Sequence, residues 1–403
     1  MTTSTATATR RLSDRFATRT GVFGDSIWTG ILEQFKKHDD PVYFGDGAPA
    51  QEIIPVERLR EASARAWEDA PGSLSYGDQQ GYAPLRDLVA SRIAARGIEI
   101  TGDDVLITQG STQAIDLACR VFLEPGDAII VEKPTFLGAL EIFRLFEVEI
   151  VAVDLDEDGM QMDALETALI EHPNAKAIYT IPTFQNPTGS SLPLERRQRM
   201  IELAREHTVA IFEDDPYGEL QYSGEALPPL RALDDEVIHL GTFSKTITPG
   251  IRTGFAIASP AIMEKMLGIR ESTDISNDRV MMRTVYHAAN GFLDGHIARA
   301  CDVYRARRDA MLAAMDEYMP EGVRWSRPNG GFFVWITLPE GLDAHEVFES
   351  GSRHGVIAFP GEWFYPHREV RRDLRLSFST VPEDRIRLGI QRLGETLREA
   401  MGG

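Results

Sequence analysis

The sequence contains few cysteines and no long apolar segment. Cys119 and Cys301 are the only cysteines among 403 residues. Each lies in an apolar segment with a helical pattern, so we expect two buried thiols rather than a disulfide, and therefore a reducing, cytoplasmic compartment. No apolar run approaches the roughly 20 residues that span a bilayer. The first residues, up to Thr9, lack the apolar core of a signal peptide and predict a disordered tail.

Positive charge is also scarce. The 42 lysines and arginines are outnumbered by 62 aspartates and glutamates, which gives a formal net charge of −20. Such an acidic chain is a poor match for nucleic acid, although it can still contain a locally positive pocket for a small anion. The chain has no internal repeat and no low-complexity linker, and we expect neither a metal site nor a membrane partner.

The larger part of the chain alternates strand-like with helix-like segments. Short runs rich in β-branched residues, each followed by turn residues, predict strands over 105–108, 128–131, 148–153, 177–180, 209–212, 236–240 and 254–258. Strands at this spacing, with helices between them, predict an α/β fold with a mostly parallel, seven-stranded sheet covered by helices.

The pattern changes after a long helix expected over 297–319. Three arginines of this helix, Arg305, Arg307 and Arg308, predict a face exposed to water. Beyond it, strands over 332–336, 356–358 and 374–378 and helices over 344–354 and 383–400 predict a smaller α/β unit.

The most informative stretch is 241–254, Gly-Thr-Phe-Ser-Lys-Thr-Ile-Thr-Pro-Gly-Ile-Arg-Thr-Gly. It places Lys245 just after a buried strand, at the edge where open α/β sheets carry out their chemistry. A lysine amine there can form a Schiff base with an aldehyde if burial or nearby cations lower its pKa. Thr242, Ser244 and Arg252 are donors suited to a phosphate. An ordinary exposed loop would also explain these residues. The alternative is a site for an aldehyde that carries a phosphate group, and this combination suggests pyridoxal phosphate.

Three further polar motifs follow predicted strands. Residues 110–113, Gly-Ser-Thr-Gln, open a helix and form either an anion site or an ordinary N-cap. Asn186 begins a turn and can donate to a phenolic oxygen. Asp214 and Asp215 either cap the next helix or place a carboxylate beside a pyridine nitrogen, which keeps the ring protonated and able to accept electrons. Tyr217 would then join Asn186 at the phenolic oxygen.

Taken together and in this order, these motifs resemble those of the class I/II aminotransferases among the fold-type I pyridoxal-phosphate enzymes. The resemblance is greatest to the broad-specificity group of 2-aminoadipate and aromatic aminotransferases, and it extends from about Thr20 to Ala400. The matching stretches are Tyr76-Gly77 with Gly81 and Leu85-Arg86, Gly110 to Gln113, Asn186 to Gly189, Asp214 to Tyr217, Ser244-Lys245, Arg252 to Gly254, and Arg375 to Phe378.

The resemblance implies a role for each matching residue. Lys245 is similar to the Schiff-base lysine that also moves the substrate proton, and Asp214, with Asp215 as the rival, is similar to the carboxylate at the pyridine nitrogen. The other implied cofactor contacts are Ser111, Thr112, Gln113, Phe136, Asn186, Tyr217, Thr242, Ser244, Arg252 and, reaching across a homodimer interface, Tyr76. Arg375 is similar to the arginine that holds the substrate carboxylate, with Gly47 on the opposite wall, and Asn186 is a further implied substrate contact.

The implied reaction is a ping-pong transfer of the amino group from an α-amino acid to a 2-oxo acid, with 2-oxoglutarate as the expected acceptor. Two alternatives remain: β-elimination or oxidation of an amino acid on the same fold, and a non-catalytic effector domain of a transcription regulator. The second requires an N-terminal helix-turn-helix domain, for which the helix predicted at 27–37 and the strand at 41–44 leave no room.

The side-chain pocket is expected from residues 19–28 and 273–277. Arg19 can meet a distal carboxylate or remain a solvated tail arginine, while Phe23, Trp28 and Phe184 suit either an apolar substrate side chain or the core. We expect a tail (1–15), an N-terminal arm with part of the small domain (16–55), a large cofactor-binding domain (56–292) and a small C-terminal domain (293–403).

Overall fold

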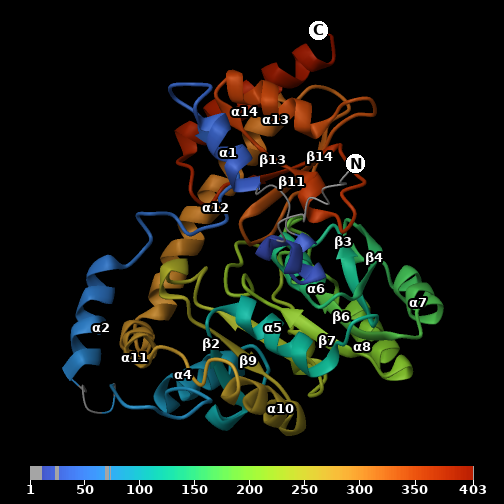
Figure 1. Ribbon diagram of the computed structural model, residues 1–403. Coiled ribbons are helices and arrows are strands. Elements are labelled where there is room, and N and C mark those ends of the chain that lie inside the picture. Colours follow the sequence, from blue (N-terminus) through green and yellow to red (C-terminus); the bar gives the residue numbers. More distant parts are fainter. Residues whose placement is uncertain (1–10, 23–26, 69–71, 73, 403) are drawn as a thin grey trace, which may run out of the picture.

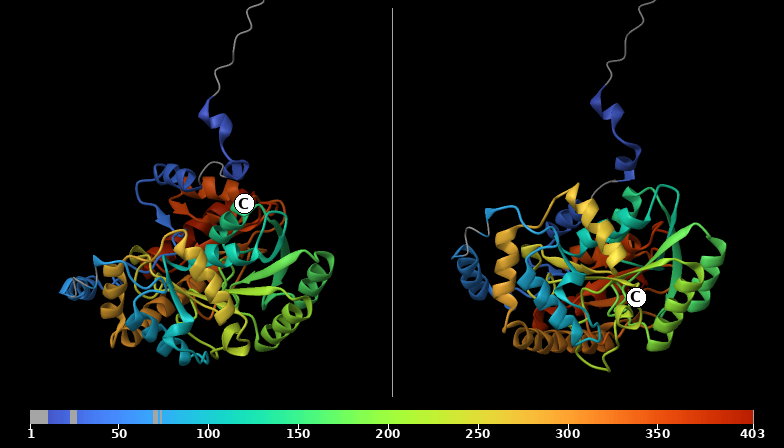
Figure 2. Two further views of the ribbon diagram at one scale, coloured as in Figure 1. Left: turned by 60° about the horizontal axis from the view of Figure 1, so that its bottom comes forward. Right: turned by 90° about the horizontal axis from the view of Figure 1, so that it is seen from below.

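The computed structural model describes residues 11–22, 27–68, 72 and 74–402. Most of the predicted tail, and Phe23, lie outside the described residues, and so does the side chain of Trp28. Leu12–Arg15 and Thr18–Val22 form two exposed 3-10 helices, η1 and η2; η1 stands out from the body of the molecule (Figure 2), whereas η2 contacts α6 (Leu137–Leu145). In the described part of the chain, no helix is long and apolar enough to cross a membrane.

A single large sheet holds all seven strands predicted for the first part of the chain, which confirms the predicted α/β fold. Its strands, in spatial order, are β2 (Val105–Thr108), β9 (Gly254–Ile257), β8 (Ile238–Thr242), β7 (Ala210–Asp214), β6 (Ala175–Thr180), β3 (Ala128–Lys133), β4 (Glu149–Asp156) and β5 (Gly159–Met160). β9 runs antiparallel to both neighbours, and β7, β6, β3 and β4 continue parallel to β8. The two-residue strand β5, which was not predicted, pairs antiparallel with β4 and makes an eighth strand.

Helices cover both faces of this sheet (Figure 1). Alternate residues of one strand enter different cores: Ile129 and Val131 pack in one buried cluster, and Ile130 in the other. The first cluster includes buried residues of α5 (Ser111–Phe122), α6 (Leu137–Leu145) and α10 (Pro260–Glu271), and the second those of α7 (Met162–Glu171) and α8 (Leu194–His207). Burial on both faces explains why the strands are apolar throughout rather than alternating.

The remaining helices of this part lie beside and below the sheet in Figure 1. They are α2 (Val56–Glu68), α4 (Ala83–Ala94), the short α9 (Leu230–Leu233) and α11 (Arg279–Ala289). α2 packs on α11 at the periphery in every view (Figures 1 and 2). The helix α12 (Leu293–Tyr318) leads from this part to a second unit.

The second unit combines both ends of the described chain, at the top of Figure 1. Its antiparallel sheet has the order β10 (Arg324–Trp325), β11 (Phe333–Thr337), β14 (Asp373–Ser377) and β13 (Phe359–Pro360). The early strand β1 (Val42–Tyr43) pairs in parallel with the late strand β12 (Val356–Ile357). The helices of this unit are α1 (Ile27–Phe35), α13 (Ala344–Arg353) and α14 (Glu383–Ala400).

The predicted water-exposed arginine face of the long helix was wrong for Arg307 and Arg308. Only 4% of Arg307 and 8% of Arg308 is exposed. Arg307 donates to the Ser379 carbonyl and pairs with Glu52, and Arg308 donates to the Pro328 carbonyl at 3.1 Å. Backbone carbonyls satisfy these guanidinium groups, so the charged face packs inward.

Candidate active site

The candidate site lies at the carboxyl ends of β6, β7 and β8, where the second unit approaches the large sheet. A cavity of about 350 Å³ lies there. Twelve of the fourteen predicted site residues line this cavity: Gly47, Ser111, Thr112, Phe136, Asn186, Asp214, Tyr217, Thr242, Ser244, Lys245, Arg252 and Arg375. Gln113 and Tyr76 do not. Residues from seven separate chain segments therefore meet at the sheet edge that the sequence predicts.

Lys245 lies three residues after β8, and its amine reaches into the cavity. Nζ donates to the Gly47 carbonyl at 2.8 Å and lies 5.9 Å from the centre of the Tyr217 ring. Burial and, to a lesser degree, the Arg375 guanidinium lower the pKa of Lys245 to about 8, against the opposing effect of Asp46. A larger fraction of this amine is therefore neutral near physiological pH than for an exposed lysine, as a nucleophile requires.

Asp214 is the last residue of β7, and only one of its two carboxylate oxygens has a hydrogen-bond partner among the described residues. Oδ2 accepts a hydrogen bond of 2.7 Å from the Tyr179 hydroxyl, whereas Oδ1 is buried without a partner among the described residues. Burial raises the pKa of Asp214 to about 7, and the hydrogen bond from Tyr179 acts in the opposite direction. A cationic N–H donor placed in the cavity would satisfy Oδ1 and keep the carboxylate ionised.

Asp215 is also buried, but it is outside the cavity and belongs to another network. Arg96 pairs with it, and His239 Nε2 lies 3.8 Å away, while the other ring nitrogen of His239 contacts Glu213 at 2.8 Å. Burial alone would raise the pKa of Asp215, but Arg96 and His239 outweigh it, so the pKa lies below its usual value. The pKa values of the two neighbouring carboxyl groups are thus shifted in opposite directions, and Asp214 is the one that faces the cavity.

Arg375 holds one side of the cavity from β14. Its Nη1 donates to Asn186 Oδ1 at 3.0 Å, and its Nη2 to the Gly45 carbonyl at 2.7 Å. The guanidinium lies between three rings at 4.2–4.9 Å, those of Phe333, Phe359 and Phe364. Such a cage fixes the plane of the guanidinium, so that it can bind a carboxylate through two parallel hydrogen bonds.

Asn186 is oriented by its contact with Arg375. Because Oδ1 accepts from the guanidinium, the amide nitrogen is directed to the other side, toward Tyr217. Burial raises the pKa of the Tyr217 phenol above its usual range, and a hydrogen bond from Asn186 opposes this effect. An amide N–H and a neutral phenol therefore stand together as donors for an oxygen anion.

An anion cradle lies at the opening of α5. Gly110 adopts φ 79°, and a Cβ atom there would come within 2.8 Å of Arg252 Nη2. The helix has no side-chain N-cap, so the first amides and the Ser111 hydroxyl stay available. Ser244 contributes from the other wall, where its amide donates to Thr242 Oγ1 at 3.1 Å. The cradle fits a phosphate group.

Gln113 and Tyr76 are placed differently from the cavity residues. The Gln113 side chain accepts from the Gln109 amide at 2.8 Å and donates to Asp274 at 2.7 Å, which leaves only its backbone amide for the cradle. Tyr76 is 87% exposed, away from the cavity of its own chain. Its contact with the cofactor of a second subunit, across a homodimer interface, stays a prediction.

Of the residues predicted for the side-chain pocket, those whose side chains the structure describes do not line the cavity. Phe184 is 4% exposed and belongs to the core, where its ring lies against Gly330 and Gly331. Arg19 is exposed on η2, a segment that contacts α6. The cavity wall is instead formed by Gly45 to Ala48, Leu137 and Phe333, of which only Gly47 was predicted.

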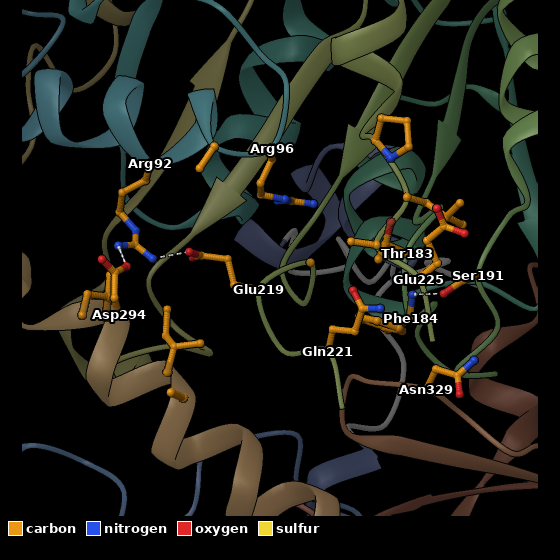
Figure 3. Close-up of a pocket in the computed structure, with 18 of the residues that line it drawn as sticks. Arg92, Arg96, Thr183, Phe184, Ser191, Glu219, Gln221, Glu225, Asp294 and Asn329 are labelled. Carbon is orange, nitrogen blue, oxygen red and sulfur yellow. Dashed lines mark hydrogen bonds and ion pairs between the residues drawn. The ribbon is translucent and has the colours of Figure 1, made fainter. Parts of the chain in front are cut away.

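A larger cleft, of about 980 Å³, opens elsewhere on the large unit (Figure 3). Its two arginines already have partners. Arg92 bonds Asp294 at 2.6 Å and also pairs with Glu219, and Arg96 pairs with Asp215. Neither Lys245 nor Arg375 reaches it, so its size does not make it the reaction site.

Comparisons with known proteins agree with this assignment. Residues 40–393 match the family described as aminotransferase class I and II. An aromatic-amino-acid aminotransferase of Thermococcus litoralis is 44% identical over 371 residues, covering 90% of this chain and 89% of the relative. The crystal structure of a multiple substrate aminotransferase from Thermococcus profundus superposes with a TM-score of 0.91 at 40% identity, over 98% of this chain and all of that one.

A third comparison includes the cofactor. The α-aminoadipate aminotransferase LysN of Thermus thermophilus was solved with N-(5′-phosphopyridoxyl)-L-leucine; it is 34% identical, with a TM-score of 0.89, over 98% of this chain and all of that one. Oδ1 of Asp214, which has no partner in the described part of the chain, and the cradle at Gly110 suit the ring nitrogen and the phosphate of such a cofactor.

Fold and site together define a pyridoxal-phosphate-dependent enzyme of fold type I. More closely, the chain belongs to the class I and II aminotransferases. It is a transaminase that acts on amino acids, similar to the aromatic-amino-acid and 2-aminoadipate enzymes.

Proposed function

We propose that this aminotransferase passes the amino group of an α-amino acid to 2-oxoglutarate in two half-reactions at the 350 Å³ cavity. One observation carries the proposal: the Lys245 amine and the Arg375 guanidinium are both held by one loop, through the carbonyls of Gly47 and Gly45. An amine that can move a proton and a clamp for a carboxylate thus face the same space.

The residues of the cavity divide into three groups in this proposal. The α5 cradle, Ser244 and Arg252 bind the phosphate, with Thr242 and the Gln113 amide as support. Asp214 would accept from the ring nitrogen, and Asn186 and Tyr217 would donate to the phenolic oxygen. Phe136, which precedes α6 at the cavity, covers the ring face. When bound, pyridoxal phosphate supplies an electron sink for the bond broken at the substrate α-carbon.

Lys245 and Arg375 divide the chemistry at the substrate. Arg375 fixes the α-carboxylate, and this orients the α-carbon–hydrogen bond relative to the ring. Lys245 Nζ, the amine nearest the Arg375 clamp in the cavity, would take up that proton and hold it for return to the reacting molecule. A carboxylate held by a caged guanidinium is a poor leaving group, which favours proton loss over decarboxylation. The aromatic and 2-aminoadipate transaminases named among the relatives support transamination over β-elimination or oxidation.

A panel of amino acids tests the proposal. Holoenzyme mixed with one amino acid at a time should convert the cofactor to its amino form, and 2-oxoglutarate should then restore the starting spectrum. The expected result is a stoichiometric, reversible absorbance change without release of ammonia. Steady release of ammonia with no oxo acid present would instead assign elimination or oxidation, and a spectrum that pyruvate but not 2-oxoglutarate restores would contradict the acceptor.

The enzyme is expected to act as a homodimer with Tyr76 completing the neighbouring site. Tyr76 is 87% exposed, and apolar side chains near it in the chain are exposed too: Val56 at 57%, Trp67 at 53% and Leu74 at 69%. An apolar surface of this kind on α2 and the segment after it is typical of a subunit interface.

Sedimentation of the holoenzyme should therefore give twice the chain mass of 44.9 kDa. Tyr76→Phe should weaken cofactor binding about ten- to hundredfold, as expected for the loss of one hydrogen bond to a charged group, without dissociating the dimer. An active monomer, or a Tyr76→Phe variant with unchanged cofactor affinity, would contradict the assignment.

A further inference from the structure

A buried carboxylate lies against the loop that carries Asn186, and the proposed function does not use it. Glu132, the next-to-last residue of β3, is only 3% exposed and does not line the cavity. Its Oε1 accepts from the Thr180 hydroxyl at 2.6 Å and from the Ile181 amide at 3.2 Å, and its Oε2 accepts from Gln185 Nε2 at 2.9 Å. Both oxygens are therefore acceptors for donors at the end of β6 and in the loop that follows it.

The side-chain amide of Gln185 passes this arrangement on toward the next turn. Its Nε2 also donates to the Pro134 carbonyl at 2.8 Å, and its Oε1 accepts from both the amide and the hydroxyl of Thr188, each at 2.8 Å. The two donor and two acceptor positions of this amide are thus all in use. A carboxylate can only accept, so Glu132 requires Nε2 to face it, and this leaves Oε1 to face Thr188.

Asn186 lies inside the turn that these hydrogen bonds close. The backbone amide of Gln185 donates to the Ser190 carbonyl at 2.8 Å, and the Gly189 amide donates to the Gln185 carbonyl at 2.7 Å. Asn186 itself presents Oδ1 to Arg375 at 3.0 Å, which leaves its amide nitrogen as a donor at the cavity. The anchors on either side of Asn186 therefore decide where that donor lies.

We propose that Glu132, acting through Gln185, is a positioning residue that fixes the place at which the Asn186 amide meets the phenolic oxygen of the cofactor. The inference rests on the proposed function, which gives that oxygen to Asn186. The physical cause is the direction of the hydrogen bonds. A donor at position 132 would oppose Gln185 Nε2, and turning the Gln185 amide over would in turn break both of its contacts with Thr188.

Glu132→Gln tests the proposal, because it turns one acceptor into a donor at nearly constant volume. The measurement is the ratio of two dissociation constants, for pyridoxal phosphate and for an analogue that lacks the phenolic oxygen. Burial raises the pKa of Glu132 to about 7, although its hydrogen bonds oppose this, so the titrations are made at about pH 8, where the wild-type carboxylate is largely ionised. The preference for pyridoxal phosphate should fall about three- to tenfold, less than the ten- to hundredfold expected when a hydrogen bond to a charged group is lost completely.

Exchanging the two side chains should restore the preference. In the double variant Glu132→Gln, Gln185→Glu, the amide at position 132 can donate to the carboxylate at position 185, which still accepts from Thr188. Only the hydrogen bond to the Pro134 carbonyl is lost, so the ratio should return to within about twofold of the wild type. A merely structural effect of removing the Glu132 carboxylate would not be reversed by a second substitution.

A second cycle asks whether the effect passes through Asn186. Asn186→Ala alone should lower the preference by the full ten- to hundredfold. Adding Glu132→Gln to Asn186→Ala should change the ratio no further, because the donor that Glu132 positions is already gone.

Hydrogen exchange of the cofactor-free protein gives a readout that needs neither turnover nor ligand. Glu132→Gln should accelerate exchange of the backbone amides of residues 188–190 about tenfold. The matched control is Asp234→Asn, which changes another buried carboxylate, bonded to Arg205 at 2.8 Å and situated before β8 rather than at its carboxyl end. This control should keep both the binding ratio and the exchange rates of residues 188–190.

A ratio within twofold of the wild type in Glu132→Gln, or an exchanged pair no better than the single variant, would overturn the role of Glu132. If Glu132→Gln does not fold, Gln185→Met interrupts the same hydrogen bonds with a side chain of similar length, and the same fall is expected of it. Wild-type protein that binds pyridoxal phosphate no better than the analogue, or does not bind it at all, would instead refute the proposed function.

Discussion

Lys245→Ala should lower turnover by about four orders of magnitude or more, the upper part of the range for loss of a positioned proton-transfer group, because the same amine also attaches the cofactor. Borohydride should then no longer fix the cofactor to the chain, although the phosphate cradle and Asp214 are still present to bind it. Lys245→Arg is the stricter variant: it keeps the positive charge and much of the length, but a guanidinium neither attaches the cofactor nor gives up its proton.

The control for this result is Lys265→Ala. Lys265 is an exposed lysine of α10 whose only ion pair in the described structure is with the adjacent Glu264. It should keep full activity and full borohydride labelling. Covalent loading of the cofactor onto the wild-type protein should accelerate as pH rises toward about 8, the pKa of Lys245, and level off above it, because the neutral amine is the reactive form. Labelling that persists in Lys245→Ala would place the attachment elsewhere.

The second large effect should distinguish the role of Asp214 from that of its neighbour Asp215. Asp214→Asn is expected to slow α-proton removal by about three orders of magnitude, each tenfold being about 1.4 kcal/mol of lost transition-state stabilisation. Cofactor affinity should fall less, since the cradle, Arg252 and Lys245 still hold it. The measurement is single-turnover conversion of the cofactor at saturating amino acid.

Asp214→Asn should not destabilise the cofactor-free protein. The raised pKa of Asp214 means that folding favours the protonated carboxyl group. Stability contributed by this group is therefore present at low pH and decreases as pH rises from the unfolded value, near 4, to the folded value of about 7. Asparagine carries no charge, so the variant avoids the free-energy cost of an ionised, buried carboxylate at high pH. Its thermal unfolding at pH 8 should therefore occur at the same temperature as that of the wild type or at a higher one.

Asp215→Asn should behave in the opposite way. Its folded pKa is depressed by Arg96 and His239, so the variant leaves the Arg96 guanidinium without its partner. Breaking such a buried pair costs about 3–5 kcal/mol of unfolding free energy, while the half-reaction should slow by less than about tenfold. If Asp215→Asn slowed proton removal more than Asp214→Asn, the assignment of the pyridine partner would be wrong.

The strand-end motifs made much of this site predictable from sequence. Lys245, Asp214 and Asn186 each follow a short apolar strand, and parallel strands bring their carboxyl ends to one edge. Arg375 was different: nothing in its local pattern locates it near residue 186, and only the resemblance to a family linked them. Its contact with the Gly45 carbonyl joins positions 330 residues apart.

Other features depended on packing that local patterns do not encode. Arg307 and Arg308 have the spacing of a solvated helix face, and only the carbonyls of Ser379 and Pro328 show that the face is buried. Tyr179 is one apolar-strand residue among several, but its hydroxyl holds Asp214. The helices α10 and α11 were not predicted; α11 buries polar Arg283 and Thr284, which weakens the apolar pattern of an amphipathic helix.

The loop from Gly45 to Gly47 also fixes when the enzyme can become active during synthesis. The strand β1, which precedes the loop, pairs with β12. The loop itself accepts hydrogen bonds from Lys245 and from Arg375. A growing chain that has passed β9, the strand that joins β2 to β8, can bring the phosphate cradle beside the lysine, but the carboxylate clamp does not exist until β14 has left the ribosome. Nascent chains stalled before β14 should accordingly be able to retain the cofactor before they can process an amino acid, so cofactor capture precedes catalysis in the life of each molecule.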